Sequence, residues 1–187
     1  PGSGYLACGY VAKGRMEEPM QILSVINKFF TQQKNVVKSS FSGKRALVTA
    51  GPTVEVIDPV RYVSNRSSGK MGYAIAEALR DKGAIVTLIS GPTHLSLPEG
   101  INVVKVESAD DMFQAVTERF AKQDIVIKAA AVSDYTPMDI LEHKLKKQEG
   151  GLSVQFKRTK DILKYLGENK THQYLVGFAA ETQNIEQ

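Results

Sequence analysis

The residues best suited to chemistry in this sequence lie in a long polar loop between a strand and a helix. The strand is the apolar run 46–50, the chain breaks at Gly51-Pro52, and a helix opens at Ser67-Ser68-Gly69. A glycine-containing loop that leads into a helix N-terminus favours anion binding, because unpaired backbone N–H groups and the helix dipole point to one place. The stretch therefore predicts an anion site.

Two side chains of the same loop are suited to act on a bound substrate. The guanidinium of Arg61 can hold a carboxylate or a phosphate with two parallel hydrogen bonds. The amide of Asn65 is a neutral N–H donor, the kind of group that stabilises an oxygen on which negative charge develops. A merely solvated loop is the alternative, but a long loop inside a compact α/β unit is usually functional.

The loop matches neither of the common nucleotide fingerprints. A Walker A loop needs Gly, four residues and then Gly-Lys-Ser/Thr, but Ser64 stands at the first Gly position and Met71 at the hydroxyl position. The G-x-G-x-x-G pattern is also absent. The next strand closes with Ser90-Gly91-Pro92 and not with the carboxylate that an NAD ribose needs. The sequence therefore argues against a P-loop and against a nicotinamide cofactor.

Strands and helices alternate from residue 46 onwards. Apolar runs too short for helices are separated by amphipathic segments, which indicates a parallel sheet covered on both faces. We predict an α/β fold that is doubly wound and Rossmann-like, with a mostly parallel sheet and helices on both faces. Ser108 and Thr159 are predicted helix caps, with Asp161 in the first turn after Thr159. The predicted strands span 46–50, 84–90, 102–106, 124–131, 152–156 and 174–179, and the predicted helices span 69–82, 109–122 and 160–168.

The N-terminal part has a different character. Residues 1–19 contain four glycines and two prolines and are predicted to form loops. Residues 21–30 show helical apolar spacing, and the polar, Ser/Lys-rich stretch 31–42 is typical of a linker. We therefore place a domain boundary in that linker.

Composition narrows the class of protein. Of the 187 residues 42% are hydrophobic and 24% are charged, as in an ordinary soluble protein. No apolar run approaches the roughly 20 residues that span a bilayer, no signal-peptide pattern is present, and no membrane partner is expected. The single cysteine, Cys8, fits a reducing cytoplasmic location. The net charge of +4 allows an anionic partner, but the lysines lack interleaved aromatics and no nucleic acid is expected.

Four collinear motifs carry a resemblance to a known family. VTAGPTVEVIDPVRYVSNRSSGKMG, KAAAVSDY, HKLKK and VGFAAET resemble phosphopantothenate–cysteine ligase, the phosphopantothenoylcysteine synthetase of coenzyme A biosynthesis. The stretch SGYLACGYVAKGRMEEP resembles the end of phosphopantothenoylcysteine decarboxylase, a flavoprotein that most bacteria fuse to the ligase. The resemblance implies a decarboxylase remnant at 1–33, a linker at 34–43 and a ligase domain at 44–187 that continues further in the parent protein.

The resemblance also implies a reaction in two steps that uses CTP with Mg²⁺. The carboxylate of 4′-phosphopantothenate attacks the α-phosphate of CTP and gives an acyl-cytidylate and pyrophosphate. The amine of L-cysteine then displaces CMP and forms an amide. A homodimer through the ligase domain and a larger assembly through the parent's decarboxylase are implied as well, and FMN belongs only to that decarboxylase.

Roles for single residues follow from the matched motifs. Asn65 corresponds to the asparagine at the acyl carbonyl, and Arg61 to an arginine near the pantothenate moiety. Lys144 corresponds to the lysine that acts on the triphosphate, with Lys147 nearby. The helix start is expected to hold phosphates through Ser67, Ser68 and Gly69.

The later motifs are expected to hold the rest of the nucleotide. Ala130 and Ala131 match the nucleotide segment, and Asp134 lies on its ribose or metal side. Phe178 lies in the segment that recognises cytosine. Cys8 corresponds to the proton donor of the decarboxylase, but the flavin-binding strands and the histidine base are missing, so this chain alone is not expected to decarboxylate.

Each role has a structural alternative. Lys144 and Lys147 can belong to a solvated lysine face, and Asp134 can cap a turn. Phe178, considered alone, is better interpreted as a core residue. For the whole chain, the alternatives are a non-catalytic nucleotide-binding or assembly fragment and a short-chain NAD(P) reductase. The reductase requires a Tyr-x-x-x-Lys pair and a glycine fingerprint, and the sequence has neither.

Overall fold

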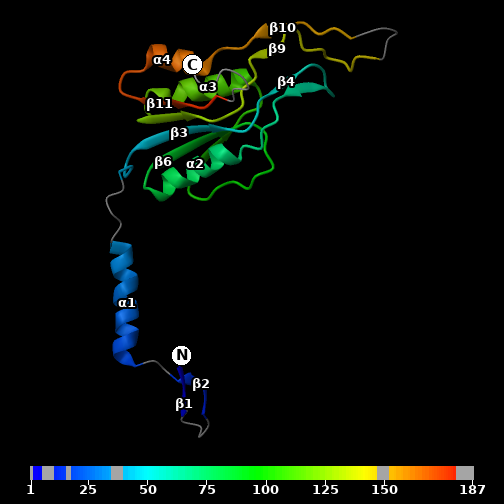
Figure 1. Ribbon diagram of the computed structural model, residues 1–187. Helices are drawn as coiled ribbons and strands as arrows, with labels where there is room; N and C mark the ends of the chain where they lie inside the picture. The colour runs from blue at the N-terminus through cyan, green and yellow to red at the C-terminus, as the bar shows by residue number, and fades with distance from the viewer. Residues whose placement is uncertain (1, 6–10, 16–17, 35–39, 147–151, 180–187) are drawn as a thin grey trace. The chain divides into compact units, whose positions relative to one another are not determined.

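The chain divides into two compact units, Pro1–Ser39 and Ser40–Gln187. The structure is a computed structural model, and Figure 1 labels its helices and most of its strands. Cys8 and Lys147, to which the sequence assigns chemical roles, lie outside the described residues. The described residues are 2–5, 11–15, 18–34, 40–146 and 152–179.

The first unit contains a hairpin and one helix. Strands β1 (Gly2–Tyr5) and β2 (Val11–Arg15) pair antiparallel, and helix α1 spans Pro19–Lys34. This helix confirms the prediction made from the apolar spacing at 21–30. The prediction of loops before it is wrong for the two strands, because backbone pairing leaves no mark in a glycine-rich composition. No helix within the described ranges is long and apolar enough to cross a membrane.

The core of the second unit is a five-stranded parallel sheet with the order β11-β8-β3-β6-β7. The chain builds outward from β3 through β6 and β7, and then restarts on the other side of β3 with β8 and β11. This order creates a topological switch point at the carboxyl ends of β3 and β8, where doubly wound proteins bind ligands. The strands are β3 (Arg45–Ala50), β6 (Ile85–Ser90), β7 (Asn102–Lys105), β8 (Ile125–Lys128) and β11 (Tyr174–Gly177).

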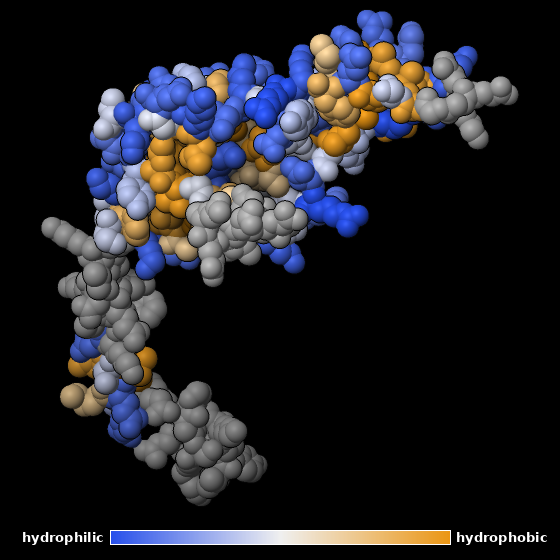
Figure 2. Space-filling model, turned by 45° about the horizontal axis from the view of Figure 1, so that its top comes forward, coloured by the Kyte–Doolittle hydropathy of each residue, from blue (hydrophilic) through white to orange (hydrophobic). Residues whose placement is uncertain are grey.

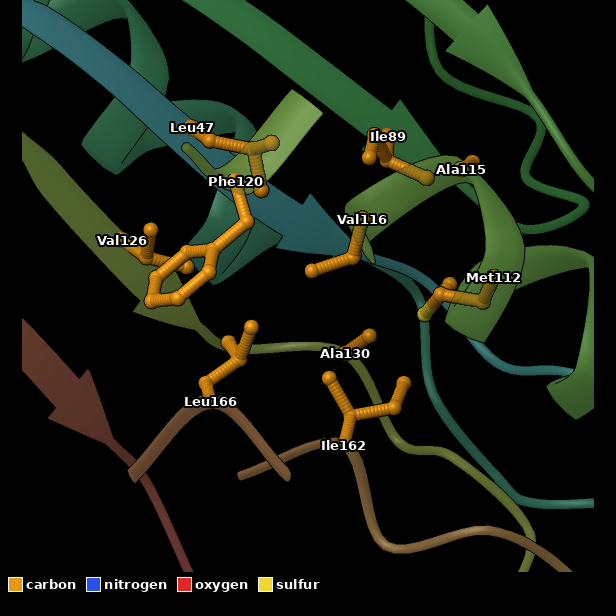
Figure 3. Packing of buried hydrophobic residues seen from close by; sticks show 10 residues of the cluster. All are labelled: Leu47, Ile89, Met112, Ala115, Val116, Phe120, Val126, Ala130, Ile162 and Leu166. Atoms are coloured by element: carbon orange, nitrogen blue, oxygen red, sulfur yellow. The ribbon is translucent and has the colours of Figure 1, made fainter. Parts of the chain in front are cut away.

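Helices cover both faces of this sheet, which confirms the predicted doubly wound, Rossmann-like α/β fold (Figure 1). Helix α2 (Lys70–Asp81) packs on one face, and α3 (Ala109–Phe120) and α4 (Ile162–Asn169) pack on the other. Side chains alternate along a strand, so β3 contributes to both layers. Figure 3 shows the α3–α4 layer, with Leu47, Ile89, Met112, Ala115, Val116, Phe120, Val126, Ala130, Ile162 and Leu166. The α2 layer contains Ala46, Val48, Ala50, Tyr73, Ala76, Leu79, Ala84, Val86 and Leu88.

The start of α4 differs from its prediction, whereas α3 begins after Ser108 as expected. The N-cap of α4 is Asp161, whose carboxylate accepts a first-turn N–H at 3.0 Å. The prediction of Thr159 as the cap is therefore wrong. The Thr159 hydroxyl donates to the Ser133 carbonyl at 2.6 Å, and its N–H donates to the Asp134 carbonyl at 2.9 Å. Thr159 thus ties the approach to α4 to the loop after β8.

Two antiparallel hairpins extend from the carboxyl edge of the sheet. Strand β4 (Val54–Val56) pairs with β5 (Tyr62–Ser64), and β9 (Tyr135–Pro137) pairs with β10 (Phe156–Arg158). The strand predicted at 152–156 is wrong in its bounds, because alternating polarity identifies an extended segment but not the residues that find a pairing partner. We call residues 138–146, which follow β9, the arm. Figure 2 shows apolar surface at this end of the molecule, to which Met138, Ile140, Leu152 and Phe156 contribute exposed side chains.

Candidate functional site at the switch point

The loops that follow β3 and β8 are hydrogen-bonded to each other at the switch point. The Ala131 N–H donates to the Gly51 carbonyl at 2.9 Å, and the Thr53 N–H donates to the Ala131 carbonyl at 3.2 Å. The Ser133 N–H donates to the buried Thr53 hydroxyl at 3.0 Å. Strand β8 therefore ends at Lys128, earlier than the predicted residue 131, because the chain leaves the sheet to join the loop after β3.

Asn65 is held over this junction. Its Nδ2 donates to the Ala131 carbonyl at 3.2 Å. The Ser64 hydroxyl donates to the Thr53 carbonyl at 2.7 Å, which fixes the backbone just before Asn65. The Asn65 side chain is exposed, and an asparagine amide carries a second N–H for a ligand. The structure thus brings together Asn65 and Ala131, two residues that the sequence assigns to the substrates.

Glycines allow the start of α2 to approach the carboxyl end of β3. Gly51 and Gly69 have φ values of +75° and +77°, in the left-handed region that favours glycine. A Cβ on Gly69 would lie 2.7 Å from Thr93 Cγ2, and a Cβ on Gly72 would lie 2.5 Å from Ala50 Cβ. Side chains at these positions would push the helix start away from the strand.

The N-terminus of α2 has no side-chain cap, unlike those of the neighbouring helices. Its N-cap residue is Gly69, whereas Ser108 caps α3 and Asp161 caps α4. The half-buried Ser67 accepts the Gly69 N–H on its hydroxyl at 3.3 Å, and Ser68 is exposed. First-turn N–H groups without a side-chain partner, together with the helix dipole, favour an anion at this position.

We expect Gly69→Ala to weaken tripolyphosphate binding about tenfold, which corresponds to about 1.4 kcal/mol. The matched control is Gly43→Ala, because Gly43 has the same backbone conformation, φ +76°, with nothing within 4 Å of an added Cβ. Both variants carry the left-handed strain of about 1–2 kcal/mol, but only the Cβ at 69 meets Thr93. Calorimetric titration measures the affinities, and equal values for the two variants would contradict this role for Gly69.

A cavity of about 340 Å³ lies beside Asp134 at the carboxyl end of β8, next to the start of α4. Lys128, Arg158 and Lys160 contribute three cationic side chains to its lining. Asp134 itself is exposed, while Ala130 is buried in the α3–α4 layer. The lining also contains Asp161, so the cavity combines two carboxylates with three cations, which suits a ligand that carries both hydroxyl and phosphate groups.

Phe178 lies at the same edge of the sheet. Its N–H donates to the carbonyl of Lys128, a residue that also lines the cavity beside Asp134, at 3.2 Å. The Phe178 side chain is 51% exposed, so its interpretation as a core residue is wrong. An exposed aromatic ring directly after the edge strand β11 is available to stack on a flat ligand group.

Arg61 is bound within its own loop. Its Nε and Nη2 donate to Asp58 Oδ2 at 2.9 and 2.5 Å, and Nη2 also donates to the Leu145 carbonyl at 3.0 Å. The Asp58 side chain is fully buried and accepts the N–H groups of Val60 and Leu145 as well. Burial opposes the ionisation of Asp58, but these hydrogen bonds outweigh it and hold its pKa well below the usual value.

We expect Asp58→Asn to lower Tm by several degrees at pH 7 and by less at pH 3. The unfolded-state pKa of Asp is about 3.9, and the folded-state pKa of Asp58 is lower. Its contribution to stability is therefore complete above about pH 4 and is lost as the pH falls through the folded-state pKa. Thermal unfolding at both pH values measures the gap, which is the difference in Tm between the unsubstituted chain and Asp58→Asn. Asp139→Asn, at an exposed aspartate of the arm, is the control, and a gap that does not narrow at pH 3 would contradict the prediction.

The donor set fits a metal ion that arrives with a ligand better than a dedicated metal centre. The described residues contain no group of three or more His, Cys, Asp or Glu side chains that could hold a metal. Mg²⁺ keeps several waters and is usually bound by one or two carboxylates plus substrate phosphates. Asp134, exposed beside the cavity, can supply one such carboxylate.

Residues 41–187 match the family described as the DNA/pantothenate metabolism flavoprotein C-terminal domain. The chain belongs to this family. The Coenzyme A biosynthesis bifunctional protein CoaBC of Bacillus subtilis (strain 168) is 54% identical over 187 residues, which are 100% of this chain and 45% of that protein. The chain thus spans about half the length of the curated relatives that it matches.

Two solved structures extend the comparison within this fold. The crystal structure of the C-terminal domain of Coenzyme A biosynthesis bifunctional protein CoaBC has a TM-score of 0.70 and 51% identity, and the match covers 79% of this chain and 70% of that one. A Cab2 mutant in complex with phosphopantothenate-cysteine has a TM-score of 0.59 and 16% identity, with 83% and 68% covered. The second likeness shows the fold alone.

The four sequence motifs did not reveal all the residues that build the site. Sequence reasoning missed Thr53 as the link between the two loops and Asp58 as the partner of Arg61. It also missed a cavity of about 600 Å³ at the carboxyl ends of β6 and β7, lined by Tyr73, Ser90 and Thr93 among others. The only sequence signal for Thr53 and Asp58 was the large number of polar residues in the loop after β3, which is more than a tight turn needs.

Proposed function

We propose that this chain carries the phosphopantothenate–cysteine ligase activity of coenzyme A biosynthesis. It would use CTP to join 4′-phosphopantothenate and L-cysteine through an acyl-cytidylate. The observation that carries the proposal is the uncapped N-terminus of α2 beside Asn65, whose carbonyl accepts the Ser67 N–H at 2.9 Å. Membership of the pantothenate family supports this choice among anion-dependent reactions.

The first step activates the carboxylate. A carboxylate oxygen of 4′-phosphopantothenate attacks the α-phosphorus of CTP, and the bond to the β-phosphate oxygen breaks, which releases pyrophosphate. We assign the phosphates to the start of α2 and a counter-charge to Lys144, with Lys147 nearby. Negative charge grows on the leaving pyrophosphate, so fixed positive groups there stabilise the transition state. The α2 phosphate residues are Ser67, Ser68 and Gly69.

The nucleotide is assigned to the edge formed by the ends of β8 and β11. Asp134 accepts from the ribose hydroxyls or holds the metal, and Phe178 packs against the cytosine. Ala130 and Ala131 supply the backbone wall between them. The exposure of Phe178 and its bond to the end of β8 support this assignment. Mg²⁺ bound with CTP would neutralise part of the triphosphate charge and polarise the α-phosphate.

The second step forms the amide. The cysteine amine attacks the acyl carbon, and the carbonyl oxygen becomes an oxyanion that accepts an N–H of Asn65. Collapse of this tetrahedral species breaks the bond to the cytidylate oxygen, releases CMP and frees the proton of the attacking amine. Arg61 borders the pantothenate moiety in this proposal, through the 37% of its side chain that is exposed.

The proposal places the ligase in a larger parent protein. The decarboxylase, with its FMN and its proton donor corresponding to Cys8, would occupy the part of the relatives that lies outside this chain. We also propose a homodimer through the ligase domain, because apolar side chains such as Met138 and Ile140 are exposed on the arm. A larger assembly would form through the decarboxylase.

Nucleotide titration tests the proposal against a non-catalytic fragment. We expect Mg²⁺-dependent binding of CTP in preference to ATP, and pyrophosphate release when phosphopantothenate is added. CTP binding without pyrophosphate release would favour the fragment. NADPH binding, or no nucleotide binding, would contradict the ligase.

A further inference from the structure

A buried carboxylate joins two segments that are far apart in the sequence. Asp58 is 1% exposed and lies in the turn between β4 and β5. Its Oδ2 accepts the N–H of Leu145, 87 positions later, at 3.2 Å. Arg61 Nη2, which is bound to the same Oδ2, donates to the Leu145 carbonyl at 3.0 Å. Both backbone groups of Leu145 are therefore bound by one ion pair, and we call Asp58, Arg61 and Leu145 the clasp.

The clasp lies next to Lys144, to which the proposed reaction assigns the triphosphate. Leu145 directly follows Lys144 in the arm, and a second bond, from the Leu141 N–H to the Ile57 carbonyl at 3.0 Å, ties the arm to the same hairpin. Strand β5 leads from Arg61 to Asn65, a span of four residues that is at most about 14 Å long. The clasp thus fixes the Lys144 backbone close to the loop that carries Asn65.

We infer that Asp58 is a positioning residue that holds the arm so that Lys144 can act on the triphosphate. The inference rests on the proposed function, since it concerns the nucleotide-dependent step. A lysine ammonium sits on a flexible four-carbon stem, so its place is set by where the backbone is anchored. Glu142, His143, Lys144 and Lys146 are all exposed, so core packing does not anchor this part of the arm.

The charge of Asp58 is the part of the clasp that a neutral side chain cannot replace. An Asn at this position keeps one acceptor oxygen, but its NH₂ group would face the donors of Arg61 or Leu145. The partly buried guanidinium would then lose its counter-charge, which is costly in a low-dielectric site. We expect the arm to detach while the sheet, whose contacts lie elsewhere, stays folded.

Hydrogen exchange of the whole chain measures this detachment without any substrate. In Asp58→Asn we expect exchange of the Leu141 and Leu145 amides to accelerate much more than exchange of β3 and β6, whose amides report only the smaller loss of global stability. The second variant is Arg61→Lys, which keeps a positive charge beside Asp58 but loses the fork that reaches Leu145. Asp139→Asn, at an exposed aspartate of the arm, is the matched control. Equal acceleration in the arm and in the sheet would overturn the inference, because Asp58 would then act only through the stability of the whole fold.

Kinetics then tests what the anchored arm does. We expect both clasp variants to lower kcat/KM for pyrophosphate release from CTP about 10- to 100-fold, as for a catalytic group displaced by about 1 Å. Neither variant should add to the loss caused by Lys144→Gln, because all three changes remove the same interaction. Unchanged pyrophosphate release from a variant with a detached arm, or losses that multiply with Lys144→Gln, would overturn the inference.

Two further outcomes distinguish this inference from direct contact between Arg61 and the substrate, and from failure of the proposed function. If Arg61→Lys alone raises the KM for phosphopantothenate while Asp58→Asn leaves all steps intact, Arg61 contacts the acid directly and Asp58 is no positioning residue. If the wild-type chain releases no pyrophosphate from CTP, the proposed function fails, and the assigned role of Asp58 fails with it. Hydrogen exchange still reports in that case whether the clasp holds the arm.

Discussion

We expect Lys144→Gln to lower the rate of pyrophosphate release from CTP and phosphopantothenate about 10- to 100-fold. A hydrogen bond to a charged group contributes about 1.5–3 kcal/mol, and each 1.4 kcal/mol is a factor of ten. Gln keeps a polar side chain that is one atom shorter, but removes the positive charge that the triphosphate requires. Single-turnover assays of pyrophosphate measure the step before any amide forms.

The matched control for this prediction is Lys146→Gln. Lys146 is exposed two positions further along the same arm, so its substitution changes the net charge equally. We expect an effect below twofold, because exposed charges that do not touch the ligand are screened. Similar losses in both variants would contradict a specific role for Lys144 and would favour a general electrostatic effect of the lysine-rich arm.

The fold was readable from the sequence because its main signals are local. Parallel strands buried on both faces appear as short apolar runs, such as 46–50 and 84–90, and the amphipathic segments between them indicate helices. The cap Ser108 lies directly before the helix that it starts. Each of these features is determined by neighbours within a few residues, so no knowledge of tertiary contacts is needed.

In the second unit, the errors involve partners that are distant in the sequence. Thr159 and Asp161 are both good caps, and the choice between them depends on the Ser133 carbonyl, which takes the Thr159 hydroxyl. The exposure of Phe178 depends on how far β11 extends before the chain leaves the sheet. Propensity and periodicity cannot supply such long-range information.

The candidate site shows the same division. The loop from Gly51 to Gly69 and the residue types in it follow from the sequence, and so does Asn65 as a donor. The partner of Arg61 does not, because the sequence indicates only that an arginine can clamp an anion. The anion that it meets among the described residues is Asp58, buried in the same turn. The guanidinium of Arg61 is thus paired with a buried carboxylate of its own turn, and the burial of that carboxylate is a tertiary feature that the sequence does not show.

We expect Asn65→Asp to stop amide formation while pyrophosphate release continues. A carboxylate at this position cannot donate to the oxyanion and repels it, and the loss of one such donor alone lowers kcat about 10²- to 10³-fold. The first step develops its charge on the phosphates, which are assigned to α2 and Lys144, so it should proceed. Parallel measurement of pyrophosphate and of phosphopantothenoylcysteine separates the two steps.

Asn65→Ala distinguishes repulsion from loss of the donor. Asn65 donates to the Ala131 carbonyl at 3.2 Å, so Asp would also place two acceptor oxygens against each other and disturb the junction of the two loops. Alanine removes the donor without that conflict. We therefore expect Asn65→Ala to slow amide formation by the factor that the loss of one donor causes, and Asn65→Asp to slow it further. Equal loss of pyrophosphate release and amide formation in both variants would instead mean that Asn65 holds the loops together, and that the oxyanion is stabilised by another group.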